Sequence, residues 1–177
     1  MRTRRLGSRT VYENRWLRLR EDEIERPDGR RGVYAVVEKE DFALVVPWDG
    51  EGVWLVGQER YTVGRHTWEF PQGGVAGATP EERARTELAE ETGLRAGTLV
   101  HLGHLDNAVG MSAQGFDVWL ATELEQGEPS PEAEEVDMSA RRVTVPEFEA
   151  MVLACELTDG ASLAGWALLG LRGGLPR

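Results

Sequence analysis

Residues Thr86–Leu94, with the sequence TELAEETGL, decide the fold because they place three glutamates on one surface of a predicted helix. Residues three and four apart are neighbours on a helix, so Glu87, Glu90 and Glu91 lie within a sector of roughly 100°. Like charges this close destabilise a helix unless a cation offsets them, and Mg²⁺ or Mn²⁺ prefers carboxylate oxygens. The segment therefore predicts a divalent metal site and chemistry on a phosphate.

The residues before this segment predict where the helix begins. Thr79–Glu82, with the sequence TPEE, supplies an N-cap, a proline for the first helical position and a capping-box glutamate, so we expect the helix to begin at the proline. Gly93 tolerates the left-handed conformation and is expected to end it. Upstream, WEFPQGG at residues 68–74 predicts a strand that runs into a glycine turn. The backbone carbonyl of Gly73 or Gly74 can approach an ion closely there.

The PQGG loop, the capped helix and the TELAEETGL segment together resemble the Nudix box of the Nudix hydrolases. The family pattern is G-x5-E-x7-R-E-U-x-E-E-x-G-U, in which U is an aliphatic residue. The resemblance implies a Mg²⁺ or Mn²⁺ site formed by Glu87, Glu90 and Glu91 with the carbonyl of Gly73 or Gly74. It also implies a pyrophosphohydrolase, an enzyme that hydrolyses phosphorus anhydrides.

Two positions depart from this pattern, since Ala78 stands where the family has glutamate and Thr86 stands where it has arginine. In the family the arginine holds the carboxylates in place, and a threonine hydroxyl forms no bidentate ion pair. Arg83 and Arg85 are close in sequence but are expected to point elsewhere around the helix. The degenerate box therefore leaves open a Nudix-fold nucleotide-binding or regulatory module with impaired catalysis.

A longer part of the chain, from about residue 34 to about residue 169, resembles the ADP-ribose pyrophosphatase branch of the family. Val56–Tyr61 is similar to a strand of that branch that ends in Gln-Tyr-Arg, Trp68–Pro71 to its Trp-Glu-Leu-Pro, and Leu157–Ser162 to the segment that opens its last helix. The resemblance implies ADP-ribose or a nucleotide sugar as substrate, and a homodimer that exchanges N-terminal strands. The PQGG sequence also occurs in Nudix hydrolases of dinucleoside polyphosphates, which is a second alternative.

Hydrolysis of a diphosphate needs a general base for the attacking water. The resemblance implies a glutamate from a loop far along the chain, with Glu134 as the first candidate and Glu135 as the second. Glu87 is an alternative base. The acidic run around residues 128–137 is also typical of a solvated loop without a catalytic role.

Three residues near the glycine turn are candidates for binding the substrate. The guanidinium of Arg60 suits phosphate oxygens. Trp68 can stack on a base, and Glu69 can accept a hydrogen bond from an exocyclic amine. A surface ion pair for Arg60 and core packing for Trp68 are the alternatives.

Periodic apolar residues outline the remaining elements. Val11–Glu25, the turn residues PDG at 27–29 and a second alternating run at Gly32–Glu38 predict an antiparallel hairpin. Phe42–Trp48 and Val53–Arg60 are expected to pair with each other in the central sheet. Further strands are expected at residues 99–105, 116–122 and 142–145, and further helices at residues 146–156 and 160–171.

The order of these elements predicts an α/β/α sandwich with a mixed sheet. We expect a Nudix domain at residues 41–177, preceded by an antiparallel β extension at residues 1–40 that forms a dimer. The chain has 177 residues, of which 41% are hydrophobic, and this is enough for one core.

Charge and cysteine content limit the partners. A formal net charge of −11 argues against nucleic-acid binding, which needs clustered positive charge, and favours a small nucleotide as substrate. Cys155 is the only cysteine, so no internal disulfide is expected and a reducing, cytoplasmic location is indicated. No apolar run predicts a signal peptide or a membrane anchor.

Overall fold

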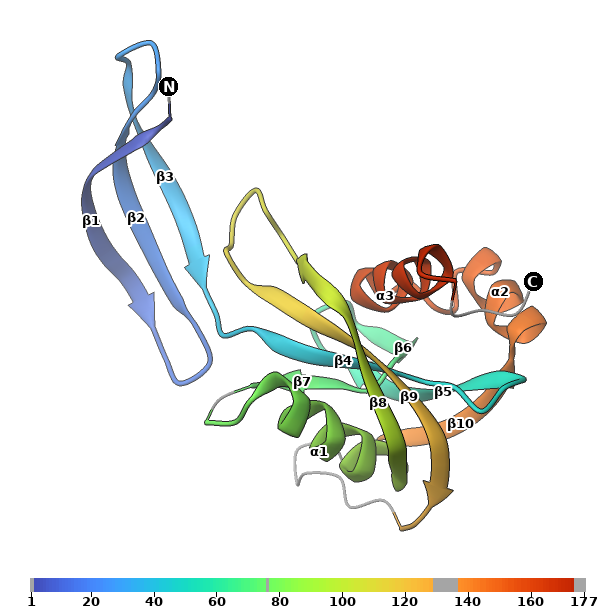
Figure 1. Ribbon diagram of the computed structural model, residues 1–177. Helices are drawn as coiled ribbons and strands as arrows, with labels where there is room; N and C mark the ends of the chain where they lie inside the picture. The colour runs from blue at the N-terminus through green and yellow to red at the C-terminus, as the bar shows by residue number, and fades with distance from the viewer. Residues whose placement is uncertain (1, 76, 129–136, 174–177) are drawn as a thin grey trace. The chain divides into compact units, whose positions relative to one another are not determined.

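The computed structural model describes residues 2–75, 77–128 and 137–173, and Figure 1 shows their helices and strands. The chain divides into two compact units. One comprises Met1–Asp41 with Asp106–Gly115, and the other comprises Phe42–Leu105 with Phe116–Arg177.

The first unit contains a three-stranded antiparallel sheet, in the order β1 (Arg4–Glu13), β2 (Arg18–Glu25) and β3 (Arg31–Glu38). The predicted continuous strand at Val11–Glu25 is wrong, because the chain turns at Asn14. The Asn14 side chain accepts hydrogen bonds from the backbone N–H groups of Trp16 and Leu17, at 2.9 and 3.0 Å. Trp16 and Leu17 keep the segment apolar through the turn, so the sequence pattern did not reveal it.

Residues 106–115 pack on β3 within the same unit. The backbone N–H of Val37 donates to the Met111 carbonyl at 2.8 Å, and the Tyr34 hydroxyl donates to the Gly110 carbonyl at 2.7 Å. Among the described residues of this unit, Ile24 is the one apolar side chain that is buried. This sheet therefore has almost no hydrophobic core of its own.

The second unit contains two sheets. The order in the central sheet is β7 (Gln72–Gly74), β4 (Phe42–Pro47), β9 (Gly115–Gln126) and β8 (Leu94–Asp106). The order in the other sheet is β10 (Ser139–Thr144), β5 (Gly52–Arg60) and β6 (Arg65–Glu69). Because β4 pairs antiparallel with β7 and parallel with β9, the central sheet is mixed, and this prediction is confirmed.

The predicted pairing of β4 with β5 is wrong. The two strands belong to different sheets and share a single isolated bridge between Trp48 and Val53. Residues Ala43–Val46 of β4 are all buried, which is typical of a central strand that is covered on both faces. Its partner is the distant strand β9, and a pattern of local hydrophobicity does not identify such a partner.

Three helices complete the second unit: α1 (Pro80–Thr92), α2 (Val145–Leu153) and α3 (Gly160–Leu171). The predicted start of α1 is confirmed. The Thr79 hydroxyl accepts a hydrogen bond from the Glu82 N–H at 3.2 Å, and the Glu82 carboxylate accepts one from the Thr79 N–H at 2.8 Å. Gly93 ends the helix with φ of 73°. Helix α2 ends earlier than predicted, and the chain beyond it reaches a positive φ of 58° at Cys155.

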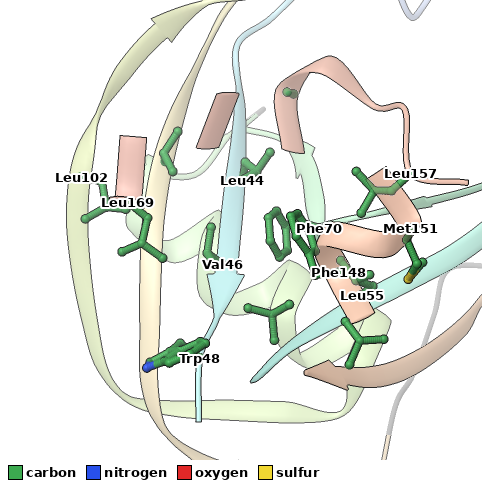
Figure 2. Packing of buried hydrophobic residues seen from close by; sticks show 14 of the residues in the cluster. Leu44, Val46, Trp48, Leu55, Phe70, Leu102, Phe148, Met151, Leu157 and Leu169 are labelled. Atoms are coloured by element: carbon green, nitrogen blue, oxygen red, sulfur yellow. The ribbon is translucent and has the colours of Figure 1, made fainter. Parts of the chain in front are cut away.

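Two apolar clusters cover the two faces of the central sheet. Leu44 and Val46 of β4 point toward the cluster that contains Phe70 and Phe148, whose rings stack with centroids 5.6 Å apart (Figure 2). The intervening residues of β4 face α1 and pack in the second cluster. Because successive side chains of a strand point to opposite faces, one strand anchors both layers. The predicted α/β/α sandwich is confirmed.

A turn between β4 and β5 provides a pH-dependent contribution to stability. The guanidinium of Arg142 forms an ion pair with Asp49, and its Nη2 donates to Asp49 Oδ1 at 3.1 Å. The hydrogen bond from Arg142 lowers the pKa of Asp49 from 3.8 to about 2. A lowered native pKa adds stability above the unfolded value, and this is lost as pH falls through the native value.

We therefore expect Asp49→Asn to lower the free energy of unfolding at pH 7 by about 1 kcal/mol, a value discounted because the side chain is partly solvated. The difference from wild type should shrink as pH falls from about 4 towards about 2. Urea unfolding followed by tryptophan fluorescence measures it. A difference that stays constant over this range would contradict the assignment.

Candidate active site

Helix α1 places two carboxylates against the edge strand β7. Glu87 and Glu91 lie one turn apart and are only 8% and 4% exposed. A Cβ atom on Gly73 would overlap the Glu87 carboxylate, so only a glycine leaves room for it. The Gln72 backbone N–H donates to Glu91 Oε2 at 3.2 Å. The predicted neighbours Glu87, Glu91 and Gly73 therefore come together.

The other predicted metal ligands lie differently. Glu90 is half-buried and lines a small hollow at the C-terminal end of α1. Gly74 is exposed, with open space where a Cβ would be. Within residues 2–75, 77–128 and 137–173, no three His, Cys, Asp or Glu side chains converge as a metal site. Glu134 and Glu135 lie outside the described residues.

Strand register identifies a carbonyl that the sequence analysis missed. The Val45 N–H donates to the Pro71 carbonyl at 2.9 Å, while the Gln72 N–H turns away from β4 to Glu91. Backbone groups of successive residues in an antiparallel ladder point to opposite sides. The carbonyls of Gln72 and Gly74 therefore face the open edge, whereas the Gly73 carbonyl faces β4. A single sequence does not reveal this direction, because it depends on which strand β7 pairs with.

These oxygens fit a hard divalent cation. Two buried carboxylates and an edge carbonyl are the donor types that Mg²⁺ and Mn²⁺ prefer, and Mg²⁺ keeps several water molecules as its other ligands. A cation at this edge would place further positive charge beside the two buried carboxylates.

Arg83 corrects an expectation from the sequence. It was expected to point elsewhere around the helix, but its Nη1 donates to Glu87 Oε1 at 3.1 Å. Side chains four residues apart on a helix are neighbours, and the long arginine spans one turn. Arg85 does point elsewhere, to Glu81 and to the Ala96 carbonyl, at 3.1 Å in each case.

A second polar cluster lies beside the glycine strand. Arg60 of β5 contacts Glu69 of β6, with Nη2 and Oε1 2.7 Å apart. Glu69 is 3% exposed, and burial raises the pKa of its carboxyl group. Its Oε2 accepts a hydrogen bond from Gln72 Nε2 at 2.9 Å. Both oxygens of Glu69 are thus already engaged within the protein.

Asp159 joins this cluster to the start of α3. Its Oδ2 accepts hydrogen bonds from the backbone N–H of Ser162 at 2.8 Å and from Gln72 Nε2 at 3.3 Å. The Ser162 hydroxyl in turn accepts from the Phe70 N–H at 2.8 Å. Gln72 therefore links three elements, because its backbone contacts α1 and its side chain contacts both β6 and the start of α3. Sequence reasoning did not single out this residue.

Three carboxylates, those of Glu69, Glu91 and Asp159, raise the pKa of Arg60. Burial alone would lower the pKa of Arg60, but the hydrogen bond and charge of Glu69 outweigh it, and the charges of Glu91 and Asp159 raise the pKa further. Its side chain is 41% exposed. The Arg60 guanidinium is held by Glu69 and is partly exposed to solvent, so it can also bind a phosphate oxygen.

Trp68 is half-buried and packs against the larger apolar cluster. The guanidinium carbon of Arg141 lies 4.7 Å from the centre of its ring, and His66 contacts the ring edge-on at 5.2 Å. This packing matches the core alternative of the sequence analysis. A stacking role for Trp68 stays a prediction.

Two protein-family models match the chain. The NUDIX domain matches residues 39–158, more than half of the sequence. The chain belongs to the Nudix family. The model of the nucleoside diphosphate sugar hydrolase N-terminal domain matches residues 4–37, the part that forms β1 to β3.

Individual relatives give the same result. An ADP-ribose pyrophosphatase of Mycobacterium tuberculosis is 37% identical over 164 residues, which are 90% of this Nudix chain and 79% of the relative. An ADP-ribose pyrophosphatase of Bacillus subtilis is 26% identical and covers 87% of the chain. An RNA pyrophosphohydrolase of Shewanella sediminis is 64% identical, but over only 33 residues.

A crystal structure of an ADP compounds hydrolase superposes with a TM-score of 0.84 and covers 98% of this Nudix chain and 96% of that chain. Its sequence identity is 20%, so the likeness shows the fold alone. The family model and the M. tuberculosis relative confirm a Nudix pyrophosphohydrolase that acts on a nucleoside diphosphate linked to another moiety. Nudix hydrolases use divalent metal ions. Among the described residues, no helix is long and apolar enough to cross a membrane.

Proposed function

We propose that this Nudix protein is a cytoplasmic, Mg²⁺-dependent pyrophosphatase of ADP-ribose or of a nucleotide sugar, with Mn²⁺ as the alternative ion. The observation that carries the proposal is the pair of buried carboxylates, Glu87 and Glu91, against the open edge of β7. The names of the M. tuberculosis relative and of the N-terminal family model support the substrate class.

Each residue then has a distinct task. Glu87, Glu91 and the Gln72 carbonyl hold the metal, and Glu90 supplies a further carboxylate on the same helix. An ion held by these residues would neutralise charge on the diphosphate oxygens and polarise the bond to be cleaved. Arg60 binds a phosphate oxygen, and Glu69 holds Arg60 in place by their 2.7 Å contact.

The general base takes a proton from the attacking water. Glu134, with Glu135 as the reserve, stays our candidate for this step. Glu87 is the less suitable choice, because Arg83 already occupies its Oε1 and Gly73 confines the same carboxylate. A base needs freedom to reach the water as well as a free oxygen.

The N-terminal sheet supports a homodimer. Its register places Tyr12, Leu19, Val33 and Val37 on one face together with Glu21 and Glu23, and Tyr12 and Val33 are more than half exposed. A three-stranded sheet needs a packed face for stability, and Ile24 alone does not provide one. We propose that the same face of a second copy covers it. Residues 1–40 thus serve as the dimerising extension of the Nudix domain at 41–177.

Val33→Glu is expected to convert the dimer to a monomer, because it adds a buried negative charge directly opposite Glu23 on this face. Size-exclusion chromatography with light scattering should give twice 19.7 kDa for wild type and 19.7 kDa for the variant. Val100→Glu is the matched control, since Val100 is 45% exposed but belongs to the other unit. A monomeric wild type, or a dimeric Val33→Glu variant, would contradict the proposal.

Hydrolysis of dinucleoside polyphosphates or of RNA 5′ ends is the second candidate. It rests on the short, high-identity matches to RNA pyrophosphohydrolases, such as 50% over 48 residues for that of Aeromonas hydrophila. Their shortness limits them to a local sequence likeness, whereas the ADP-ribose pyrophosphatase match extends over most of the chain. The third candidate, a nucleotide-binding module with impaired catalysis, rests on Ala78 and Thr86.

A substrate panel separates these functions. ADP-ribose, ADP-glucose, diadenosine tetraphosphate and 5′-triphosphorylated RNA are each incubated with Mg²⁺, and the products are separated by chromatography. We expect AMP and a sugar phosphate from ADP-ribose or ADP-glucose at the highest kcat/KM. Preferred cleavage of diadenosine tetraphosphate or RNA would favour the second function. Thermal stabilisation by nucleotides without any product would favour the binding module.

A further inference from the structure

The pair Arg83–Glu87 explains how this chain functions with a threonine at position 86. Arg83 Nη1 lies 3.1 Å from Glu87 Oε1. We infer that Arg83 is a positioning residue that holds Glu87 in its metal-binding orientation, a task that the Thr86 hydroxyl does not perform from its exposed position. The inference rests on the proposed metal site.

Helix stability alone does not explain an arginine at this position. Arg83 lies at the N-terminal end of α1, where the helix dipole disfavours a cation. The order arginine before glutamate at i,i+4 is also the weaker one, whereas the pair Glu81–Arg85 on the same helix has the stronger order. The contact with Glu87 is therefore the specific interaction that Arg83 makes.

Burial sets the Arg83 contact apart from an ordinary surface ion pair. The side chains of Arg83 and Glu87 are 22% and 10% exposed, against 44% and 52% for Arg85 and Glu81. The loss of Arg83 would remove a guanidinium from a buried carboxylate, and Glu87 would no longer be held in its present direction. Arg83 Nε is itself buried without a hydrogen-bond partner among the described residues, whereas its Nη1 contacts Glu87.

The geometry leaves room for a metal ion as well. Gly73 confines the Glu87 carboxylate on one side, and the guanidinium binds Oε1 from another. A carboxylate has about four lone-pair sites on two oxygens, so the hydrogen bond from Arg83 to Oε1 uses only part of its capacity to bind donors and cations. Arg83 thus fixes the direction of Glu87 without occupying all of its ligand positions.

Mn²⁺ binding to the full-length protein tests this inference independently of turnover. The free-Mn²⁺ signal in electron paramagnetic resonance gives the dissociation constant for wild type and for Arg83→Gln. We expect Arg83→Gln to weaken Mn²⁺ binding about 10-fold, as for other partners of metal ligands. Arg85→Gln removes an arginine that forms an i,i+4 ion pair with Glu81 on the same helix, and it should change the Mn²⁺ dissociation constant less than about twofold. Equal affinity in Arg83→Gln and wild type, or an equal loss in Arg85→Gln, overturns the inference.

Two further variants complete the test. Arg83→Lys keeps the positive charge but loses the planar guanidinium with its several N–H donors, and we expect it to bind Mn²⁺ about threefold more weakly than wild type. This variant tests the inference if Arg83→Gln fails to fold. Wild-type affinity in Arg83→Lys would then overturn the inference. Thr86→Arg alone should change the Mn²⁺ affinity little, but in combination with Arg83→Gln it should restore most of the Mn²⁺ affinity that Arg83→Gln loses. An equal effect in both backgrounds would show that the two positions share no task.

The outcomes also separate this inference from the proposed function. If wild type binds Mn²⁺ but hydrolyses no substrate, and Arg83→Gln binds Mn²⁺ weakly, the inference that Arg83 positions Glu87 is supported and the proposed hydrolase function is contradicted. If wild type hydrolyses the substrate and Arg83→Gln binds Mn²⁺ as tightly as wild type, the proposed function is supported and the inference about Arg83 is contradicted. Wild type that binds no Mn²⁺ contradicts both.

Discussion

Glu91→Gln is expected to lower kcat for ADP-ribose hydrolysis by about 10³-fold, which corresponds to about 4 kcal/mol of transition-state stabilisation. Glu91 is 4% exposed and meets the β7 edge at Gln72. The amide has the shape of the carboxylate, and its oxygen can still accept the Gln72 N–H. It lacks the negative charge that holds a hard cation. The variant should therefore unfold at nearly the wild-type temperature while losing turnover.

Glu81→Gln is the matched control for this substitution. Glu81 lies on the same helix, and its side chain is 52% exposed in an ion pair with Arg85. Its loss should change kcat less than about twofold and stability by less than about 0.5 kcal/mol. A Glu91→Gln variant that keeps more than about a tenth of wild-type kcat would show that the metal lies elsewhere.

Gly73→Ala is expected to lower kcat about 100-fold through a single added methyl group. The Cβ would overlap the Glu87 carboxylate, so Glu87 has to leave the position that Gly73 and Arg83 define. Substitutions that displace a ligand by about 1 Å commonly cost this much activity. Steady-state kinetics over a range of Mg²⁺ concentrations measures the change, and half-maximal activity should require more Mg²⁺.

Gly74→Ala controls for the loss of backbone flexibility in β7. A Cβ on Gly74 meets no atom within 4 Å, so its activity and Mg²⁺ requirement should stay close to those of wild type. If Gly74→Ala lost as much activity as Gly73→Ala, a general distortion of the strand would explain both effects. The specific contact between Gly73 and Glu87 would then be unnecessary.

The sequence was sufficient where local chemistry determines local structure. The capping box at Thr79 and the left-handed Gly93 define both ends of α1 without any tertiary contact. Helical spacing likewise placed Glu87 and Glu91 together, and the start of α3 at Gly160 follows from the N-cap at Asp159. These features need only neighbours within a few positions along the chain.

The sequence was insufficient where structure depends on distant partners. The short connection between β4 and β5 suggested a hairpin, but β4 pairs with β9, more than 70 positions away. The Gln72 carbonyl faces the open edge only because of the register between β7 and β4. The contact of Gln72 with Asp159 likewise joins residues 87 positions apart.

Arg83 shows a limit of family patterns. Thr86 departs from the Nudix box, and this suggested an impaired enzyme while Arg83 was expected to point away. The side chain of Arg83 is long enough to reach Glu87 across one helical turn, so a different position supplies a guanidinium to the same carboxylate. A consensus sequence records the position at which arginine usually occurs. The site itself requires only that a guanidinium contacts the glutamate carboxylate, whichever position supplies it.

The most direct test is a single reaction of the wild-type protein with ADP-ribose and Mg²⁺, followed by addition of EDTA and then of excess Mg²⁺. Chromatography of timed samples measures AMP and ribose 5-phosphate. We expect equal amounts of the two products, an immediate stop with EDTA and full resumption when Mg²⁺ is restored. Continued hydrolysis in EDTA, or intact ADP-ribose at saturating Mg²⁺, would contradict a metal-dependent ADP-ribose pyrophosphatase.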